Sequence, residues 1–147
     1  MVQPIILVIF YSRSGATEKL ALAAGVGAVQ ERALIRLRRL PDLNPQEVIE
    51  RFPRSKETLV RMHKEYVSPA ESDLLAADAL IFAMPRDLKT SEDWKPHLDM
   101  LARLRSEGRL EGKLVATLTS TTVEEATEQG RKVAAMAREA KKRITEP

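Results

Sequence analysis

The chain has 147 residues, of which 44% are hydrophobic, 31% charged and only 4% aromatic. That length suits one ordinary domain with a mainly aliphatic core, so we expect residues 1–147 to form a single domain. The chain contains no cysteine, which excludes disulfides, thiolate catalysis and cysteine-ligated zinc or iron–sulfur sites.

Four short segments have the patterning of β-strands. Residues 5–11 and 79–84 are continuous apolar runs, which are typical of strands buried on both faces. Residues 33–37 alternate, with three apolar side chains on one face and an arginine on the other, which suits an edge strand with one partly wet face. Residues 114–118 form a shorter apolar strand that ends in a run of hydroxyl residues.

Helical periodicity fills the segments between these strands. Small or apolar residues recur at helical spacing over residues 20–28, 91–106 and 123–144. The long connection between the second and third strands holds two shorter helical candidates, residues 44–52 and 55–66, separated by a proline. Strands that alternate with helices predict an α/β fold with a mainly parallel sheet.

Ligands of such sheets bind beyond the carboxyl ends of the strands, so the loops at 12–17, 85–90 and 119–122 are the candidate sites. The first of them, SRSGAT, has the ingredients of an anion site. Gly15 lets the backbone approach a ligand closely, the following helix start offers N–H groups, and three hydroxyls can donate hydrogen bonds. The alternative is that Ser14 or Thr17 simply caps the helix, a common use of these residues.

The S-x-S-G-x-T pattern of this loop resembles the phosphate loop of flavodoxins, which bind FMN at the switch point of their sheet. Further segments are similar, in the same order, to the flavodoxin-like NAD(P)H:quinone oxidoreductases of the WrbA (tryptophan-repressor-binding-protein) type. They are LIRLRRLPD, SPAESDLLAADALIFAMPR, WKPHLDMLARLRSEGRLEGK, LVATLTSTT and EEATEQGRKVAAMAREA. In the segment SPAESDLLAADALIFAMPR, the resemblance implies an acidic turn that leads into the apolar third strand.

The resemblance implies a flavodoxin-like three-layer sandwich with a parallel sheet in the strand order 2-1-3-4. It also implies FMN as the cofactor, NAD(P)H as the hydride donor and a quinone as the acceptor, with the redox chemistry supplied by the flavin. It implies no metal and no particular catalytic residue. The residues that it assigns to cofactor binding are Ser12, Arg13, Ser14, Gly15, Ala16, Thr17, Pro85, Arg86, Asp87, Thr119, Ser120, Thr121 and Thr122.

Two departures from the family pattern affect the flavin ring. The second loop reads PRDLKTSED where the family has T-R-[FY]-G, and TSTT runs straight into the last helix, without the fifth strand and its loop. The fourth strand therefore becomes an edge, which we expect the last helix, the long connection or a second copy in a homo-oligomer to cover. The alternative function is a non-catalytic flavodoxin-fold relative that acts through oligomerisation or a protein partner.

The arginines of the second strand allow two interpretations. Arg36, Arg38 and Arg39 could contact a nucleotide phosphate or nucleic acid, but charged protection of an edge strand explains them equally well. The net charge of +3 suits an anionic ligand and is too small to indicate nucleic acid. We therefore expect no nucleic-acid partner.

The remaining features predict location and packing. No segment approaches the roughly 20 apolar residues of a membrane span, and the first residues lack the positive region of a signal peptide. With the absence of cysteine, this leads us to expect a soluble cytoplasmic protein. His63 and His97 show no metal-ligand spacing and are interpreted as surface or helix-end residues, and Trp94 as a core or rim residue.

Overall fold

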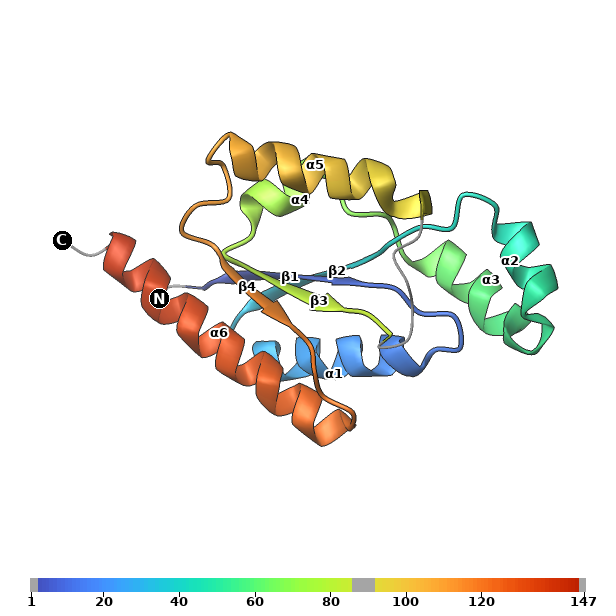
Figure 1. Ribbon diagram of the computed structural model, residues 1–147. Helices are drawn as coiled ribbons and strands as arrows, with labels where there is room; N and C mark the ends of the chain where they lie inside the picture. The colour runs from blue at the N-terminus through green and yellow to red at the C-terminus, as the bar shows by residue number, and fades with distance from the viewer. Residues whose placement is uncertain (1–2, 86–91, 146–147) are drawn as a thin grey trace.

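The computed structural model describes residues 3–85 and 92–145. Four parallel strands form one sheet in the order β2-β1-β3-β4 (Figure 1), which confirms the predicted order 2-1-3-4. The strands are β1 (Ile5–Phe10), β2 (Leu34–Arg39), β3 (Ala79–Ala83) and β4 (Leu114–Thr117). The second strand shifts most from its predicted segment, because residues 34–39 pair with the whole length of β1.

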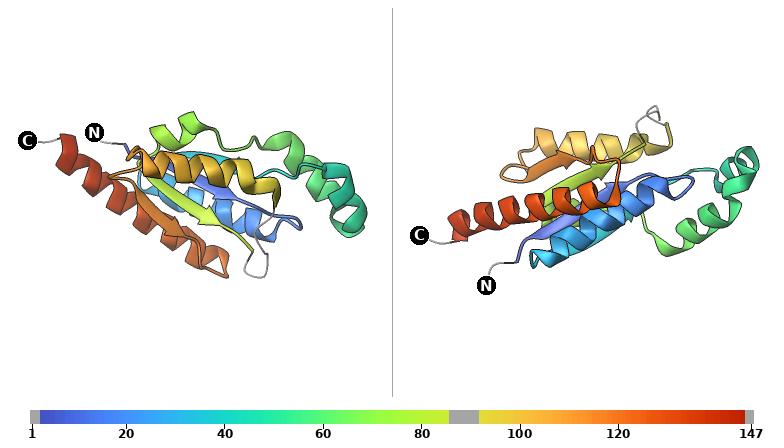
Figure 2. Two further views of the ribbon diagram at one scale, coloured as in Figure 1. Left: turned by 45° about the horizontal axis from the view of Figure 1, so that its top comes forward. Right: turned by 90° about the horizontal axis from the view of Figure 1, so that it is seen from below.

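Helices cover both faces of the sheet, giving three layers (Figures 1 and 2). One face carries α1 (Ala16–Gln30) and α6 (Val123–Thr145), and the other carries α4 (Glu71–Ala76) and α5 (Lys95–Ser106). The long connection after β2 forms α2 (Pro45–Arg51), the 3₁₀ turn η1 (Pro53–Ser55) and α3 (Lys56–Glu65), and α2 and α3 lie beyond the carboxyl end of the sheet (Figure 1). A second 3₁₀ turn, η2 (Glu92–Trp94), leads into α5.

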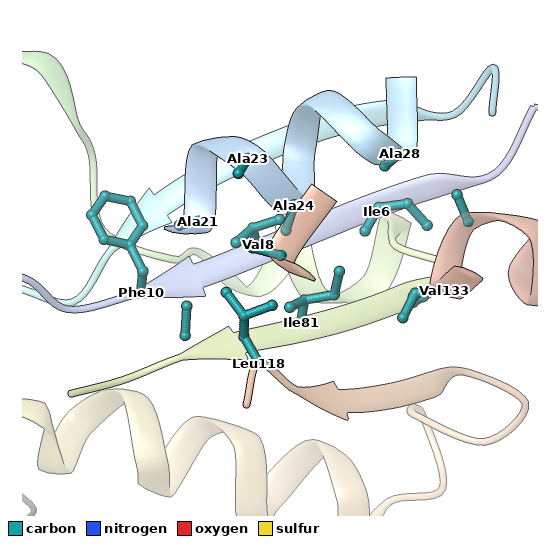
Figure 3. Close-up of a cluster of buried hydrophobic side chains, with 14 of the residues drawn as sticks. Ile6, Val8, Phe10, Ala21, Ala23, Ala24, Ala28, Ile81, Leu118 and Val133 are labelled. Carbon is teal, nitrogen blue, oxygen red and sulfur yellow. The ribbon is translucent and has the colours of Figure 1, made fainter. Parts of the chain in front are cut away.

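The alternation of side chains along β1 divides the core into two clusters. Ile6, Val8 and Phe10 point toward α1 and α6 and share one cluster with the alanines of both helices. Figure 3 shows those of α1, together with Val133 of α6. Ile9 and Tyr11 belong to the cluster under α4 and α5. Successive residues of a strand point to opposite faces, so a continuous apolar run is what a strand buried on both sides requires. The prediction that the first and third strands are buried on both faces is confirmed.

Two glycines set the close crossing of α1 and α6. A Cβ added at Gly27 would lie 1.9 Å from the carbonyl oxygen of Thr127, and one at Gly130 would lie 1.9 Å from that of Ala24. No real Cβ tolerates such a distance, so the two backbones touch only because both positions lack a side chain. Figure 1 shows the two helices side by side beneath the sheet.

Two parts of the prediction need refinement. The acidic turn before the third strand is a short helix, α4, whose N-terminus is closed by Asp73: Oδ2 of Asp73 accepts a hydrogen bond from the Ala70 N–H at 3.0 Å. Strand β4 pairs only with β3 within residues 3–85 and 92–145, and Val115 is 63% exposed. Helix α6 covers part of this edge, since the Gln129 side chain donates to the Thr117 carbonyl at 2.8 Å.

Candidate functional site

The loop after β1 turns on Gly15, which has φ 95° and precedes the first residue of α1. Its N–H donates to Ser12 Oγ at 3.0 Å, and its carbonyl accepts the first helical hydrogen bond, from Lys19, at 3.0 Å. The N–H groups of the first helical turn therefore have no intrahelical partner, and they open toward the loop with partial positive charge.

This geometry bears on the alternative of a plain helix cap. Gly15 occupies the N-cap position and has no side chain to accept a hydrogen bond. Ser14 Oγ accepts from the Ala16 N–H only at 3.4 Å, and Thr17 lies inside the first turn. Neither residue is an ordinary N-cap, so plain capping of α1 does not account for the hydroxyls of Ser14 and Thr17.

Members of all three candidate loops meet around one hollow of about 220 Å³ beside the start of α1, which we call the loop hollow. The chain brings these residues together because the carboxyl ends of parallel β1, β3 and β4 share one edge of the sheet. Hydroxyl groups come from Thr17, Ser120 and Thr121, and apolar walls from both sides of them. The lining residues are Thr17, Leu20, Ala83, Met84, Pro85, Leu118, Ser120 and Thr121.

The other predicted residues lie around the loop hollow or away from it. Ser120 Oγ donates to Gln129 at 3.0 Å, while Thr122 Oγ1 accepts from the Glu125 N–H at 3.2 Å and so caps α6. The Thr119 N–H donates to Gln129 at 3.3 Å. The predicted ligands Arg86 and Asp87 lie outside the described residues.

Arg13 points away from the loop hollow. Its guanidinium carbon lies 4.5 Å from the centre of the Phe52 ring, and its Nε donates to the Tyr11 hydroxyl at 3.2 Å. Arg13 instead borders a separate polar hollow of about 210 Å³ near α2. Arg13 therefore belongs to the first candidate loop, but its side chain lies toward the end of α2, away from the loop hollow.

Arg39, at the end of β2, binds the backbone of the first loop. It is only 3% exposed and donates to the Ser12 carbonyl at 2.8 Å and to Asp42 at 3.1 Å. Asp42 also accepts from the Tyr11 hydroxyl at 2.7 Å and lies 3.1 Å from His63 Nε2. Burial, followed by the bond to Asp42, raises the pKa of Tyr11 above its ordinary value. This network fixes the backbone from which the loop projects.

A buried carboxylate, Glu18, stands in the first turn of α1. Arg61 of α3 donates to both of its oxygens, at 2.9 and 2.6 Å, and the Tyr66 hydroxyl donates at 2.6 Å. The Arg61 hydrogen bonds lower the pKa of Glu18, whereas burial acts in the opposite direction. Because Arg61 balances its charge, Glu18 repels an anion at the helix start much less than a free carboxylate would.

The arginines of β2 thus divide into two groups that the sequence does not separate. Arg36 and Arg38 pair with Asp73 of α4 at 3.4 and 2.9 Å. Burial acts to raise the pKa of Asp73, but the hydrogen bonds from Arg38, the Ala70 N–H and Arg36 together hold it below its ordinary value. Arg39 is a buried support and does not protect the edge, so the edge-protection interpretation is wrong for that residue. The difference lies in their partners: Asp73 of α4 for Arg36 and Arg38, but Asp42 and the Ser12 carbonyl for Arg39.

Trp94 and His63, which the sequence analysis also considered, lie in the core and at a helix end. Trp94 is 4% exposed and packs against Tyr11 with ring centres 4.9 Å apart, as a core residue should. His63 is in the last turn of α3, as expected for a helix-end residue. Within the described part of the chain, no three metal-ligating side chains cluster, and no helix is long and apolar enough to span a membrane.

Comparison with solved structures defines the class of protein. A Streptococcus pneumoniae flavodoxin has a TM-score of 0.55 at 12% sequence identity, over 90% of this chain and 99% of that one. A flavodoxin from the domain Archaea has a TM-score of 0.53 at 14% identity, over 90% of this chain and 98% of that one. The protein therefore has a flavodoxin-like fold, with the parallel order 2-1-3-4 in its described sheet.

Curated relatives narrow this class. An Archaeoglobus fulgidus protein named NAD(P)H dehydrogenase (quinone) is 38% identical over 116 residues, which are 78% of this chain and 60% of that protein. A Paracoccus denitrificans protein of the same name is 32% identical over 117 residues, 79% of this chain and 53% of that protein. The chain is a flavodoxin-like relative of these dehydrogenases, as the sequence resemblance predicted. It spans between about half and three fifths of their length, and no family model matches it.

Proposed function

We propose that this protein binds FMN at the loop hollow and passes a hydride from NAD(P)H to a quinone through that flavin. The observation that carries the proposal is the meeting of Thr17, Pro85, Ser120 and Thr121 around one hollow at the carboxyl ends of β1, β3 and β4. The names of the curated relatives, NAD(P)H dehydrogenase (quinone), support the same reaction.

The residues present fit the phosphate end of FMN. Thr17 borders the loop hollow, and its hydroxyl, that of Ser14 and the N–H groups of the first turn of α1 would hold the phosphate, with Gly15 allowing the close approach. Ser12 is 1% exposed and would shape this loop through the hydrogen bond that its Oγ accepts from the Gly15 N–H. The loop hollow, at about 220 Å³, is smaller than the roughly 300 Å³ at which pockets for drug-sized ligands begin, so it would take the phosphate and ribityl chain. When bound, the flavin supplies the redox chemistry.

The other two loops complete the proposed site. We assign Pro85, Arg86 and Asp87 to the ribityl chain or ring, on the strength of the family resemblance. Residues 119–122 would lie along the opposite side of the flavin, with Ser120 and Thr121 nearest to the loop hollow. In this arrangement the chain binds and orients the cofactor, and its apolar wall of Leu118 and Ala83 excludes water.

The test is a pair of matched substitutions that each replace a hydroxyl by a methyl group. Thr17→Val removes one donor from the loop hollow, whereas Thr127→Val does so on α6, where the hydroxyl donates to the Val123 carbonyl at 2.8 Å. A hydrogen bond to a charged phosphate is worth about 1.5–3 kcal/mol, so Thr17→Val should weaken FMN binding by about tenfold or more. Quenching of flavin fluorescence measures this. No quenching by the unaltered protein, or equal loss in both variants, would refute the assignment.

Binding and turnover separate the two candidate functions. A non-catalytic relative is favoured by the two departures from the family pattern, the second loop PRDLKTSED and the direct passage from TSTT into α6. Reduction of a quinone by NAD(P)H in the presence of the FMN-loaded protein, measured as the loss of NAD(P)H absorbance, would rule out the non-catalytic alternative. FMN binding without such turnover would support it instead.

We also propose that the protein is a cytoplasmic homo-oligomer of single-domain chains, with a second copy at the free edge of β4. Val115 is exposed there, next to an open apolar hollow lined by Leu80, Phe82, Leu101 and Leu110. Edges of this kind are usually covered in natural proteins. Light scattering should give a mass above one chain, and Val115→Lys should lower it. A monomeric mass for the unaltered protein would contradict the proposal.

A further inference from the structure

A second, partly open hollow lies on the other face of the sheet, beneath α5, and we call it the α5 cavity. Its volume is about 260 Å³, and almost all of its wall is apolar. The residues that shape it come from three strands, from η2 and from α5: Ile9, Phe82, Thr117, Trp94, Leu98 and Leu101. Phe82 and Thr117 point away from the α1–α6 side, so the α5 cavity does not belong to the loop hollow.

One buried polar group in this apolar wall lacks a partner. Trp94 is only 4% exposed, and its indole Nε1–H has no hydrogen-bond acceptor among the described residues. The neighbouring Tyr11 hydroxyl donates to Asp42 and accepts from Arg13, and it makes no hydrogen bond with the indole. Buried Trp N–H groups nearly always have a partner. Trp94 borders both the α5 cavity and the polar hollow near α2. A buried donor that has no partner among the described residues is available to an acceptor atom of a ligand in the α5 cavity.

The volume limits the size of that ligand. An apolar cavity of about 150 Å³ binds benzene, so about 260 Å³ has room for two fused rings. It is below the range of roughly 300–1,000 Å³ for drug-sized molecules, which excludes a whole flavin nucleotide. Met84 and Met100 also line the cavity, and their flexible thioethers adapt to flat aromatic surfaces.

We infer that the α5 cavity binds a small, flat aromatic molecule of about two fused rings that carries one carbonyl oxygen, and that this oxygen accepts a hydrogen bond from Trp94 Nε1. The apolar strands and α5 enclose the rings, and the indole N–H selects the carbonyl. The cavity opens near Leu98, which is 40% exposed, and near the exposed Thr117. This site needs no flavin, so it stands apart from the proposed redox function.

Indanone and indane are suitable probes, because they differ only in the carbonyl group. The chain has a single tryptophan, so a change in its fluorescence reports directly from the cavity wall. Calorimetry should show indanone binding about three- to tenfold more tightly than indane, the worth of one neutral hydrogen bond. In Trp94→Phe the two probes should bind equally. Equal binding to the unaltered protein, or no binding up to the solubility of indanone, would overturn the inference.

Two substitutions on one strand locate the site. Thr117→Phe places a ring in the mouth of the α5 cavity, whereas Val115→Phe, two residues earlier on the same face of β4, enters the neighbouring open hollow. Indanone binding should be lost in Thr117→Phe and kept in Val115→Phe, and the reverse result would refute the assignment. Flavin fluorescence is measured on the same samples, so a failure of FMN binding is distinguished from a failure at this cavity.

Discussion

The crossing of α1 and α6 offers a sharp test of the packing, through Gly130→Ala. In an isolated helix this change stabilises by about 1 kcal/mol, because alanine has the higher helix propensity. Here the new Cβ would lie 1.9 Å from the Ala24 carbonyl oxygen and 2.6 Å from its carbon. Ordinary contact needs at least 3.4 Å, so the helices must move apart along their whole seam.

Overpacking costs about 1–3 kcal/mol, and the upper end applies because the obstacle is backbone. The alanines that lie in the seam, Ala24, Ala126 and Ala134, are fully buried and would lose contacts. We expect a net loss of about 2 kcal/mol in the free energy of unfolding. For a chain of this size that lowers Tm by about 4–8 °C.

Urea and thermal unfolding, followed by far-UV circular dichroism, measure this loss. Gly25→Ala is the matched control in the same helix pair, because its Cβ would meet only the end of the flexible Ile35 side chain, at 2.9 Å. We expect that variant to be within about 0.5 kcal/mol of the unaltered protein, or more stable. A Gly130→Ala protein as stable as the unaltered chain would refute the reasoning, as would an equal loss in Gly25→Ala.

Two further predictions concern the first loop and its support. Gly15→Ala and Gly112→Ala both force a side chain into positive φ, 95° and 80°, so each should cost about 1–2 kcal/mol of stability, but only Gly15→Ala should weaken FMN binding in a fluorescence titration. Equal FMN affinities would remove Gly15 from the site. Because Arg61 lowers the pKa of Glu18 below the ordinary 4.5, the stability from Glu18 is present above that pH and is lost as the pH falls through the lowered value. Glu18→Gln should therefore cost about 1–2 kcal/mol in the free energy of unfolding at neutral pH, measured by urea unfolding. The free energy of the variant should also fall less steeply than that of the unaltered protein as the pH is lowered through the acid range, and an equal fall in both proteins would contradict this.

Local patterns in the sequence predict the four strands and most of the helices, and the family resemblance supplies the strand order 2-1-3-4. The apolar run of β1 predicts burial on both faces, and the helical stripe over 123–144 matches α6, Val123–Thr145. Parallel strands place their carboxyl ends at one edge, so the meeting of three candidate loops follows once the strand order is known. The short helix α4 is missed because its six residues give too little periodicity.

Local patterns in the sequence could not reveal the buried charged residues that hold the first loop and the start of α1 in place. Arg39 and Asp42 are near each other in the chain, but their role beneath Ser12 depends on the pairing of β2 with β1. Glu18 meets Arg61 from a distance of 43 residues along the chain. In the sequence all four are ordinary charged residues, and charge alone does not distinguish a buried support from a solvated surface.

The sequence by itself therefore determines the features that short stretches of residues specify: strands, helices, the glycine turn and the hydroxyl-rich loops. These depend on backbone preferences and on the period of apolar side chains, which act over a few residues. Only the tertiary structure decides which side chains face each other. It turns Arg13 away from the loop hollow, leaves Trp94 Nε1 without a partner among the described residues, and brings Gly27 and Gly130 to a helix crossing where no side chain fits. These outcomes follow from contacts between distant segments, whose geometry no local pattern contains.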